Sequence, residues 1–333
     1  MRNRGITRII LRTRSFSTQR PINLRKMPRL NAVSQSAIDR LRLYKPPPTN
    51  YDLVPLSRRA AVLLLLYADL KGDLRVVLTI RAKTLSSYAG QAALPGGRAD
   101  SLEETPFQTA RREALEEIGL PDIHQSFPQP FTVEHLCELP ANLARTELVV
   151  RPCVALLHSY DERTGQNADP EVSLIPKLDA REVAAVFTAP FHNFLRMSDE
   201  DQWGGNPADW YQGAWTEWHQ SNWRMHQFFV PVQHQSVVKP RTINQQQKEA
   251  VSALEEGEKP GVVTRYRVFG MTARMLVDVA RVAYAEEPEF EHNSHFGDEH
   301  LIAQLRKMGR LSPLRKSGDI LTREDMEKAA KLS

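Results

Sequence analysis

The most constraining feature of this 333-residue chain is a short segment whose chemistry marks both ends of a helix at residues 106–118. Thr105 is suited to cap the start, with a glutamine three residues later and Pro106 at the first helical position. Gly119 is suited to the left-handed residue that follows a helix, and Pro121 prevents the helix from continuing. The segment therefore predicts a helix whose start and end are set by local chemistry.

The predicted helix has one acidic face and one apolar face. Glu113, Glu116 and Glu117 follow one another at steps of three and one residues, so that all three carboxylates lie on the same side of the helix. The apolar face carries residues suited to packing on a sheet: Ala110, Ala114 and Ile118. A like-charge pair at helical spacing costs only about 0.2–0.5 kcal/mol, so a solvated acidic face is one interpretation of the cluster.

The residues around the acidic face favour a second interpretation, a cation site. The preceding loop reads LPGGR, and its glycines Gly96 and Gly97 permit a close approach of the backbone. Arg111 and Arg112 are placed to hold nearby carboxylates. Carboxylates beside free carbonyl groups form an all-oxygen site, which hard cations such as Mg²⁺ or Mn²⁺ prefer. Because such ions bridge protein carboxylates and phosphates, we expect a small phosphorylated molecule as the substrate.

The stretch GGRADSLEETPFQTARREALEEIGL (residues 96–120) resembles the Nudix box, in which glycines, glutamates and an arginine recur at fixed spacing. The positions that match are Glu104, Arg112, Glu113, Glu116, Glu117, Gly119 and Leu120, with Ala114 at an aliphatic position. Gly97 and Glu104 are separated by six residues where the general pattern has five. This expansion is typical of the coenzyme A diphosphatase branch of the family.

A second stretch, VLTIRAKTLSSYAGQAALPGG (residues 77–97), is similar to a motif that lies upstream of the Nudix box in the same branch. It departs from that motif at Tyr88, where histidine is usual, and at Leu94, where phenylalanine is usual. The similarity to the fungal coenzyme A diphosphatases extends over roughly residues 55–290.

The resemblance implies an α+β protein with the Nudix fold, an α–β–α sandwich with a mixed sheet and a catalytic loop–helix–loop. It also implies hydrolysis of the diphosphate bond of coenzyme A or acyl-coenzyme A with Mg²⁺ or Mn²⁺, giving 3′,5′-ADP and the (acyl-)4′-phosphopantetheine. Glu113 and Glu117 would be the first metal ligands, Glu116 a third and the carbonyl group of Gly97 a fourth. Arg112 would orient Glu104, and one of the glutamates or a later acid would act as the base.

Other residues are candidates for substrate binding. Arg81 and Lys83 lie upstream of the glycine loop and would meet the 3′-phosphate of coenzyme A, unless they form a solvated strand end. Gly96 and Gly97 would let the substrate approach the backbone. Glu182 is either an additional metal ligand or substrate contact, or a surface acid at the start of a strand.

Two other functions are compatible with a Nudix box. One is hydrolysis of another nucleoside diphosphate derivative, such as NADH, ADP-ribose or an oxidised nucleotide, and Tyr88 is the feature in its favour. The other is a scaffold that has the Nudix fold but no activity. The intact glutamates and Arg112 argue against a scaffold, because a protein without catalysis has no need for a repulsive acidic cluster.

The charge of the chain is divided unequally. Nine basic residues and no acid lie in residues 1–38, so the net charge of +4 for the whole chain becomes −5 for residues 39–333. An acidic body gives no support for nucleic-acid binding. The arginine- and serine-containing N-terminal segment has the composition of a mitochondrial transit peptide, or else is a basic tail without structure. A peroxisomal location is the alternative, since the related fungal enzymes are implied to be peroxisomal.

We expect four segments: a disordered leader (1–38), a linker with a short helix (39–57), a Nudix domain (58–290) and a polar tail (291–333) that includes a partly ordered helix. The domain includes a Trp-rich insertion at 200–225, which either packs on itself or forms a lid that stacks on an aromatic base of the substrate. The longest apolar run, AAVLLLLYADL, is too short to span a bilayer and predicts a buried strand, paired as a hairpin with LRVVLTIRA. No feature of the sequence indicates an oligomeric state.

Overall fold

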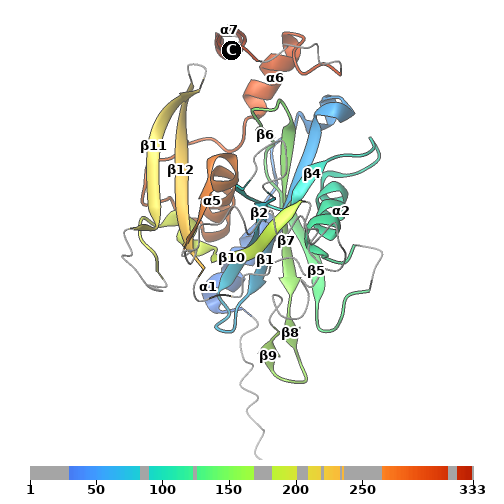
Figure 1. Cartoon of the computed structure of the whole chain (residues 1–333), viewed down its shortest axis with the longest axis vertical. Helices are drawn as coiled ribbons and strands as arrows, with labels where there is room; N and C mark the ends of the chain where they lie inside the picture. The colour runs from blue at the N-terminus through green and yellow to red at the C-terminus, as the bar shows by residue number, and fades with distance from the viewer. Residues whose placement is uncertain are drawn as a thin grey trace, which may run out of the picture.

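The computed structural model describes residues 30–82, 90–122, 126–168, 182–200, 209–218, 221–232, 235, 265–313 and 321–331. A mixed sheet lies at its centre (Figure 1), in the order β10 (Val183–Pro190), β2 (Leu74–Arg81), β1 (Arg59–Ala68), β7 (Val149–His158) and β5 (Thr132–Glu138). β1 runs parallel to β7, and the other neighbours in this order are antiparallel. Three short strands pair at the edges of this path: β3 (Ala92–Ala93) with β2, β4 (Gly96–Arg98) with β1, and β6 (Asn142–Leu143) with β7.

The central strand β1 supplies apolar side chains to both faces of the sheet. Leu64 and Leu66 belong to a cluster on one face, whereas Leu63 and Leu65 belong to a cluster on the other, and all four are fully buried. Because side chains alternate along a strand, a continuous apolar run is what a strand covered on both faces requires. The predicted hairpin of β1 and β2 is confirmed.

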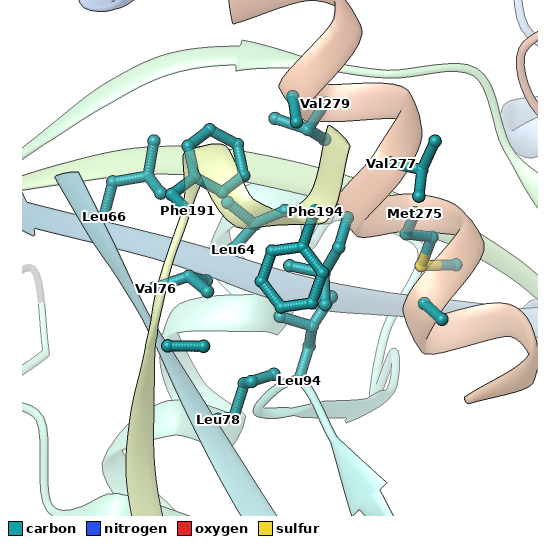
Figure 2. Packing of buried hydrophobic residues seen from close by; sticks show 14 of the residues in the cluster. Leu64, Leu66, Val76, Leu78, Leu94, Phe191, Phe194, Met275, Val277 and Val279 are labelled. Atoms are coloured by element: carbon teal, nitrogen blue, oxygen red, sulfur yellow. The ribbon is translucent and has the colours of Figure 1, made fainter. Parts of the chain in front are cut away.

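Helices cover both faces of this sheet (Figure 1). α2 (Pro106–Ile118) packs on one face, and α1 (Ala32–Leu43) and α5 (Gly270–Tyr284) pack on the other. Figure 2 shows the packing of the α5 face, where Met275, Val277 and Val279 lie beside Phe194 and near the other labelled apolar side chains: Phe191, the strand residues Leu64, Leu66, Val76 and Leu78, and Leu94 before β4. The expected α–β–α sandwich with a mixed sheet is confirmed. Within the described residues, no helix is both long and apolar enough to cross a membrane.

The Trp-rich segment forms part of a second, antiparallel sheet, in the order β11 (Tyr211–Trp218), β12 (Ser221–Pro231) and β13 (Arg265–Phe269). This sheet lies beside α5 (Figure 1). Trp210, just before β11, is fully buried against Phe194 and donates from Nε1 to the carbonyl oxygen of Asn193 at 2.9 Å. The segment therefore packs on the body of the protein and not only on itself. Trp203 lies outside the described residues.

Helix α1 begins earlier than the sequence analysis expected. The side chain of Asn31 accepts a hydrogen bond from the N–H group of Ser34 at 2.9 Å, so the helix starts at Ala32. Ile38 is fully buried in the core, although we placed it in a disordered leader. That boundary is wrong because an asparagine cap and a buried apolar face precede it. Residues 1–29, which hold the basic residues of the leader, lie outside the described residues.

The expected polar tail is packed against the domain. α6 (Glu299–Lys307) and α7 (Arg323–Lys331) contribute to a third apolar cluster together with residues from the segment before β1 and from the β6–β7 hairpin. The buried members are Tyr51, Val54, Ala141, Leu143, Val149, Ile302, Leu305, Leu311, Leu321, Met326 and Ala329. The tail is helical in part, as expected, but the burial of this segment and of the linker in a shared apolar cluster was not predicted.

Candidate active site

Helix α2 has the two ends that its sequence predicts. The hydroxyl oxygen of Thr105 accepts from the N–H group of Gln108 at 3.2 Å, and Gln108 Oε1 accepts from the N–H group of Thr105 at 2.9 Å. Gly119 follows the helix in the left-handed conformation, with φ of 70°. The apolar face, Ala110, Ala114 and Ile118, is fully buried against the sheet. Packing of this face fixes the direction in which the acidic face points.

The glycine loop meets the acidic face at two glutamates. Pairing of β4 with β1 holds Gly96 and Gly97 beside α2. The N–H group of Gly96 donates to Glu117 Oε2 at 3.1 Å. Gly97 lies so close to Glu113 that a Cβ atom added to the glycine would be 2.4 Å from Glu113 Oε1. The structure thus brings Glu113 and Glu117 together at the loop, as the cation-site interpretation requires.

A substitution tests this close approach. Gly97→Ala would force the Glu113 carboxylate away from the loop, because a Cβ atom in that position would overlap it. We expect kcat/KM for diphosphate hydrolysis to fall about 10²-fold, the typical cost of displacing a catalytic group by about 1 Å. Ser101→Ala in the same loop is the matched control and should change kcat/KM less than about threefold. A Gly97→Ala enzyme as active as the control would show that Glu113 does not act from this position.

The electrostatics of the pair suit a positively charged ligand. Only 4% of Glu117 is exposed, and burial, with the neighbouring carboxylates of Glu113 and Glu182, raises its pKa to about 8. The N–H group of Gly96 and the guanidinium of Arg81 act against this rise. Burial also raises the pKa of Glu113. A bound cation would favour the ionised form of both carboxylates, and so would relieve the unfavourable burial of charge.

Arg112 connects the helix to the loop that precedes it. Its Nε donates to Glu104 Oε1 at 2.9 Å, and its Nη2 donates to the carbonyl oxygen of Arg98 at 2.7 Å. Glu104 also accepts from the hydroxyl group of Thr109 at 3.0 Å and from the N–H group of Asp100 at 2.9 Å. The sequence analysis did not single out Thr109 or Asp100, and no spacing rule marks them. Glu104 is thereby the centre of a junction that holds the loop against α2.

Two further charged residues of α2 lie away from the buried pair. The side chain of Glu116 is 53% exposed and contacts Arg112 Nη1 at 3.5 Å. Arg111 is buried, its guanidinium lies over the rings of Phe107 and Phe127, and it donates to the carbonyl oxygen of Pro121. The expectation that Arg111 holds a carboxylate of the cluster is wrong. Successive helical residues point about 100° apart, so Arg111 and Arg112 face different surroundings.

Of the substrate-binding candidates outside the glycine loop, Arg81 and Glu182 lie near the buried pair of glutamates. Arg81, the last residue of β2, has its Nη1 3.9 Å from Glu117 Oε1. Glu182 lies beside it, because its carbonyl oxygen accepts from the N–H group of Ala82 at 2.8 Å, and its side chain contributes to the raised pKa of Glu113 and Glu117. Lys83 and Tyr88 lie outside the described residues.

The donor set fits a divalent cation shared with a phosphorylated substrate. Within the described part of the chain, no three His, Cys, Asp or Glu side chains converge on one point as in an all-protein cage. Mg²⁺ is commonly bound through only one or two carboxylates, with water and substrate phosphates completing its shell. Glu113 and Glu117, brought together at a loop whose glycine leaves no room for a side chain, match that smaller set.

Comparison with known proteins identifies the class of protein. The NUDIX domain family matches residues 57–202. Peroxisomal coenzyme A diphosphatase 1 of Saccharomyces cerevisiae is 32% identical over 293 residues, which cover 81% of this chain and 82% of the yeast protein. Nudix hydrolase 22, chloroplastic, of Arabidopsis thaliana is 39% identical over 265 residues, 77% of this chain and 66% of the plant protein. The chain therefore belongs to the Nudix hydrolase family, and its α–β–α sandwich is the Nudix fold.

A third relative matches only the central part of the chain. Nudix hydrolase 15, mitochondrial, of Arabidopsis thaliana is 36% identical over 152 residues, which cover 44% of this chain and 47% of the plant protein. The family match and the similarity to the yeast enzyme together make the protein a Nudix diphosphatase, an enzyme that acts on small-molecule substrates.

Proposed function

We propose that this enzyme hydrolyses the diphosphate bond of coenzyme A or acyl-coenzyme A. The products are 3′,5′-ADP and 4′-phosphopantetheine or its acyl derivative. The observation that carries the proposal is the pair of buried carboxylates, Glu113 and Glu117, at a glycine loop. Support for coenzyme A among the Nudix substrates comes from the yeast coenzyme A diphosphatase, which is similar over 81% of this chain.

The proposed chemistry assigns each group of the site a task. Glu113, Glu117 and the carbonyl group of Gly97 would hold Mg²⁺ or Mn²⁺, and Glu116 is a more exposed further candidate. When bound, the cation neutralises the diphosphate and makes a water molecule more acidic. A carboxylate of the group Glu113, Glu117 and Glu182 takes the proton of the attacking water. Arg112 acts indirectly, because it fixes Glu104 and so the loop that carries the glycines.

The substrate is tested by product analysis. Purified protein with Mg²⁺ is incubated separately with coenzyme A, an acyl-coenzyme A, NADH and ADP-ribose, and the products are separated by chromatography. We expect 3′,5′-ADP from coenzyme A or its acyl derivative, and none when EDTA removes the metal. Cleavage of NADH or ADP-ribose alone would contradict the substrate assignment and keep the Nudix chemistry. No cleavage of any of the four would favour a scaffold.

We also propose a mitochondrial location, on the composition of the N-terminal segment. The peroxisome is the alternative, since the yeast relative is named as a peroxisomal protein. Fluorescence microscopy of the full chain and of a chain without residues 1–29, which hold all nine basic residues of the segment and end before α1, separates the two. Mitochondrial signal that is lost with those residues supports the proposal, and peroxisomal signal from the full chain contradicts it.

A further inference from the structure

Arg81 places a positive charge beside a carboxylate that the proposed function assigns to the metal. Its main chain is fixed by two hydrogen bonds of 3.0 Å, from its own N–H group to the carbonyl oxygen of Gln91 and from the N–H group of Gly90 to its own carbonyl oxygen. It is also paired with Val183 of β10. Only its side chain is therefore able to move relative to the sheet.

The guanidinium of Arg81 is held weakly. Its Nη1 lies 3.9 Å from Glu117 Oε1, well beyond the 2.7–2.9 Å or so of a charge-assisted hydrogen bond. Its Nε is buried and has no hydrogen-bond partner among the described residues. Arg112 is the contrasting case, since it donates to Glu104, to Glu113 and to the carbonyl oxygen of Arg98. Arg112 is thus fixed by its partners, whereas the Nε of Arg81 donates to none of the described residues.

The guanidinium of Arg81 in its present position would be repelled by a divalent metal ion bound to Glu117. Glu117 presents two oxygens, of which Oε2 accepts from Gly96 and Oε1 faces Arg81. A divalent ion on Glu117 would repel a guanidinium a few ångströms away. Once displaced, the guanidinium would present several N–H donors in a planar fork, the geometry that matches phosphate oxygens.

We propose that Arg81 is a placeholder cation, which compensates Glu117 until a divalent metal binds and then turns its guanidinium to an oxygen of the substrate diphosphate. This inference rests on the proposed function. It places Arg81 at the diphosphate, whereas its position upstream of the glycine loop led us to expect a contact with the 3′-phosphate. Metal and diphosphate then assist each other's binding, because the metal releases the group that the diphosphate needs, and such coupling is reciprocal.

The placeholder role makes an unusual prediction, that loss of an arginine strengthens metal binding. Mg²⁺ affinity is measured by calorimetry without substrate, at about pH 9 so that the carboxylates are ionised. We expect Arg81→Met to bind Mg²⁺ about tenfold more tightly than the wild type, because the competing charge is gone. Arg81→Lys keeps the charge and should stay within about threefold of the wild type. Arg75→Met removes the same charge from the same strand and should have no effect beyond about twofold.

The second measurement concerns substrate. At saturating Mg²⁺, Arg81→Met should raise KM for coenzyme A about tenfold or more, because a phosphate contact is lost. A purely structural role of Arg81 would weaken Mg²⁺ binding or leave it unchanged. Either result, together with loss of Mg²⁺ binding in Glu117→Gln, would overturn the placeholder role and leave the metal site in place. Unchanged Mg²⁺ binding in Glu117→Gln would instead overturn the metal site, and with it the proposed mechanism.

Discussion

Replacement of Glu117 by glutamine is expected to lower kcat for diphosphate hydrolysis by about 10³-fold or more while the protein stays folded. Residues that only orient metal ligands typically cost about 10–100-fold when they are lost, so a ligand itself should cost more. The amide keeps an oxygen that can accept from the N–H group of Gly96, and it keeps the volume of the side chain. Because Glu117 is 4% exposed and burial disfavours its charge more than the guanidinium of Arg81 favours it, a neutral residue there should not lower the free energy of unfolding. Activity is measured as 3′,5′-ADP formation, and stability by urea denaturation.

Glu116→Gln is the matched control for this substitution. It removes the same charge from the next residue of the same helix, but its side chain is 53% exposed and faces Arg112 at 3.5 Å. We expect its loss of kcat to be at least about tenfold smaller than that of Glu117→Gln, since a neutralised exposed carboxylate leaves the buried pair intact. Equal losses of kcat would mean that the exposed Glu116 is as important for catalysis as the buried Glu117. Full activity of Glu117→Gln would remove the buried pair from the mechanism.

The arrangement of α2 beside the glycine loop was largely predictable because it depends on local chemistry. The caps at Thr105 and Gly119 fix the ends of α2, and the helical period then determines which side chains share a face. The apolar residues of the opposite face had to be buried, which turns the glutamates towards the glycine loop. The sequence analysis expected a close approach of the backbone at Gly97, and the structure shows it, since a side chain there would overlap Glu113.

The prediction for Arg111 in α2 was wrong because the helical period was not applied to it. Arg111 and Arg112 are adjacent in sequence and identical in type, so composition treats them alike. Their directions differ by about 100°, which places Arg111 against Phe107 and Phe127 and Arg112 against Glu104. A consistent use of the helical period would have separated them, because Phe107 precedes Arg111 by four residues.

The ends of the chain were misjudged because their structure depends on distant partners. The sequence of α6 has few apolar residues, yet Ile302 and Leu305 are fully buried in the apolar cluster that also contains Tyr51 and Leu143. No local sequence pattern predicts a contact between segments that lie more than a hundred residues apart. The boundary near residue 38 failed for a related reason, since Ile38 is buried only because α5 and the sheet cover it.

Glu299→Ala is expected to destabilise the protein by about 3–5 kcal/mol, the range typical of breaking a buried pair. Its carboxylate, 15% exposed, accepts from the Thr49 hydroxyl at 2.7 Å, from the N–H groups of Asn50 at 2.7 Å and Ala141 at 2.8 Å, and from Arg151 Nη1 at 3.3 Å. It therefore joins α6 to the segment before β1, to the turn before β6 and to β7. Its removal leaves two backbone donors and a buried guanidinium partly unsatisfied, each at a cost of about 1–3 kcal/mol before relaxation.

This destabilisation is measured from urea denaturation of the full chain. Glu299→Gln retains one acceptor oxygen and should lose about half as much, since the neutral hydrogen bonds are kept and the ion pair is not. Glu324→Ala on α7 is the control, because its carboxylate is 75% exposed and, among the described residues, pairs with Lys328 on the surface, so its effect should stay within about 0.5 kcal/mol. A cost below about 1 kcal/mol for Glu299→Ala would mean that Glu299 contributes little to holding the C-terminal helices, because water then replaces the carboxylate at each donor.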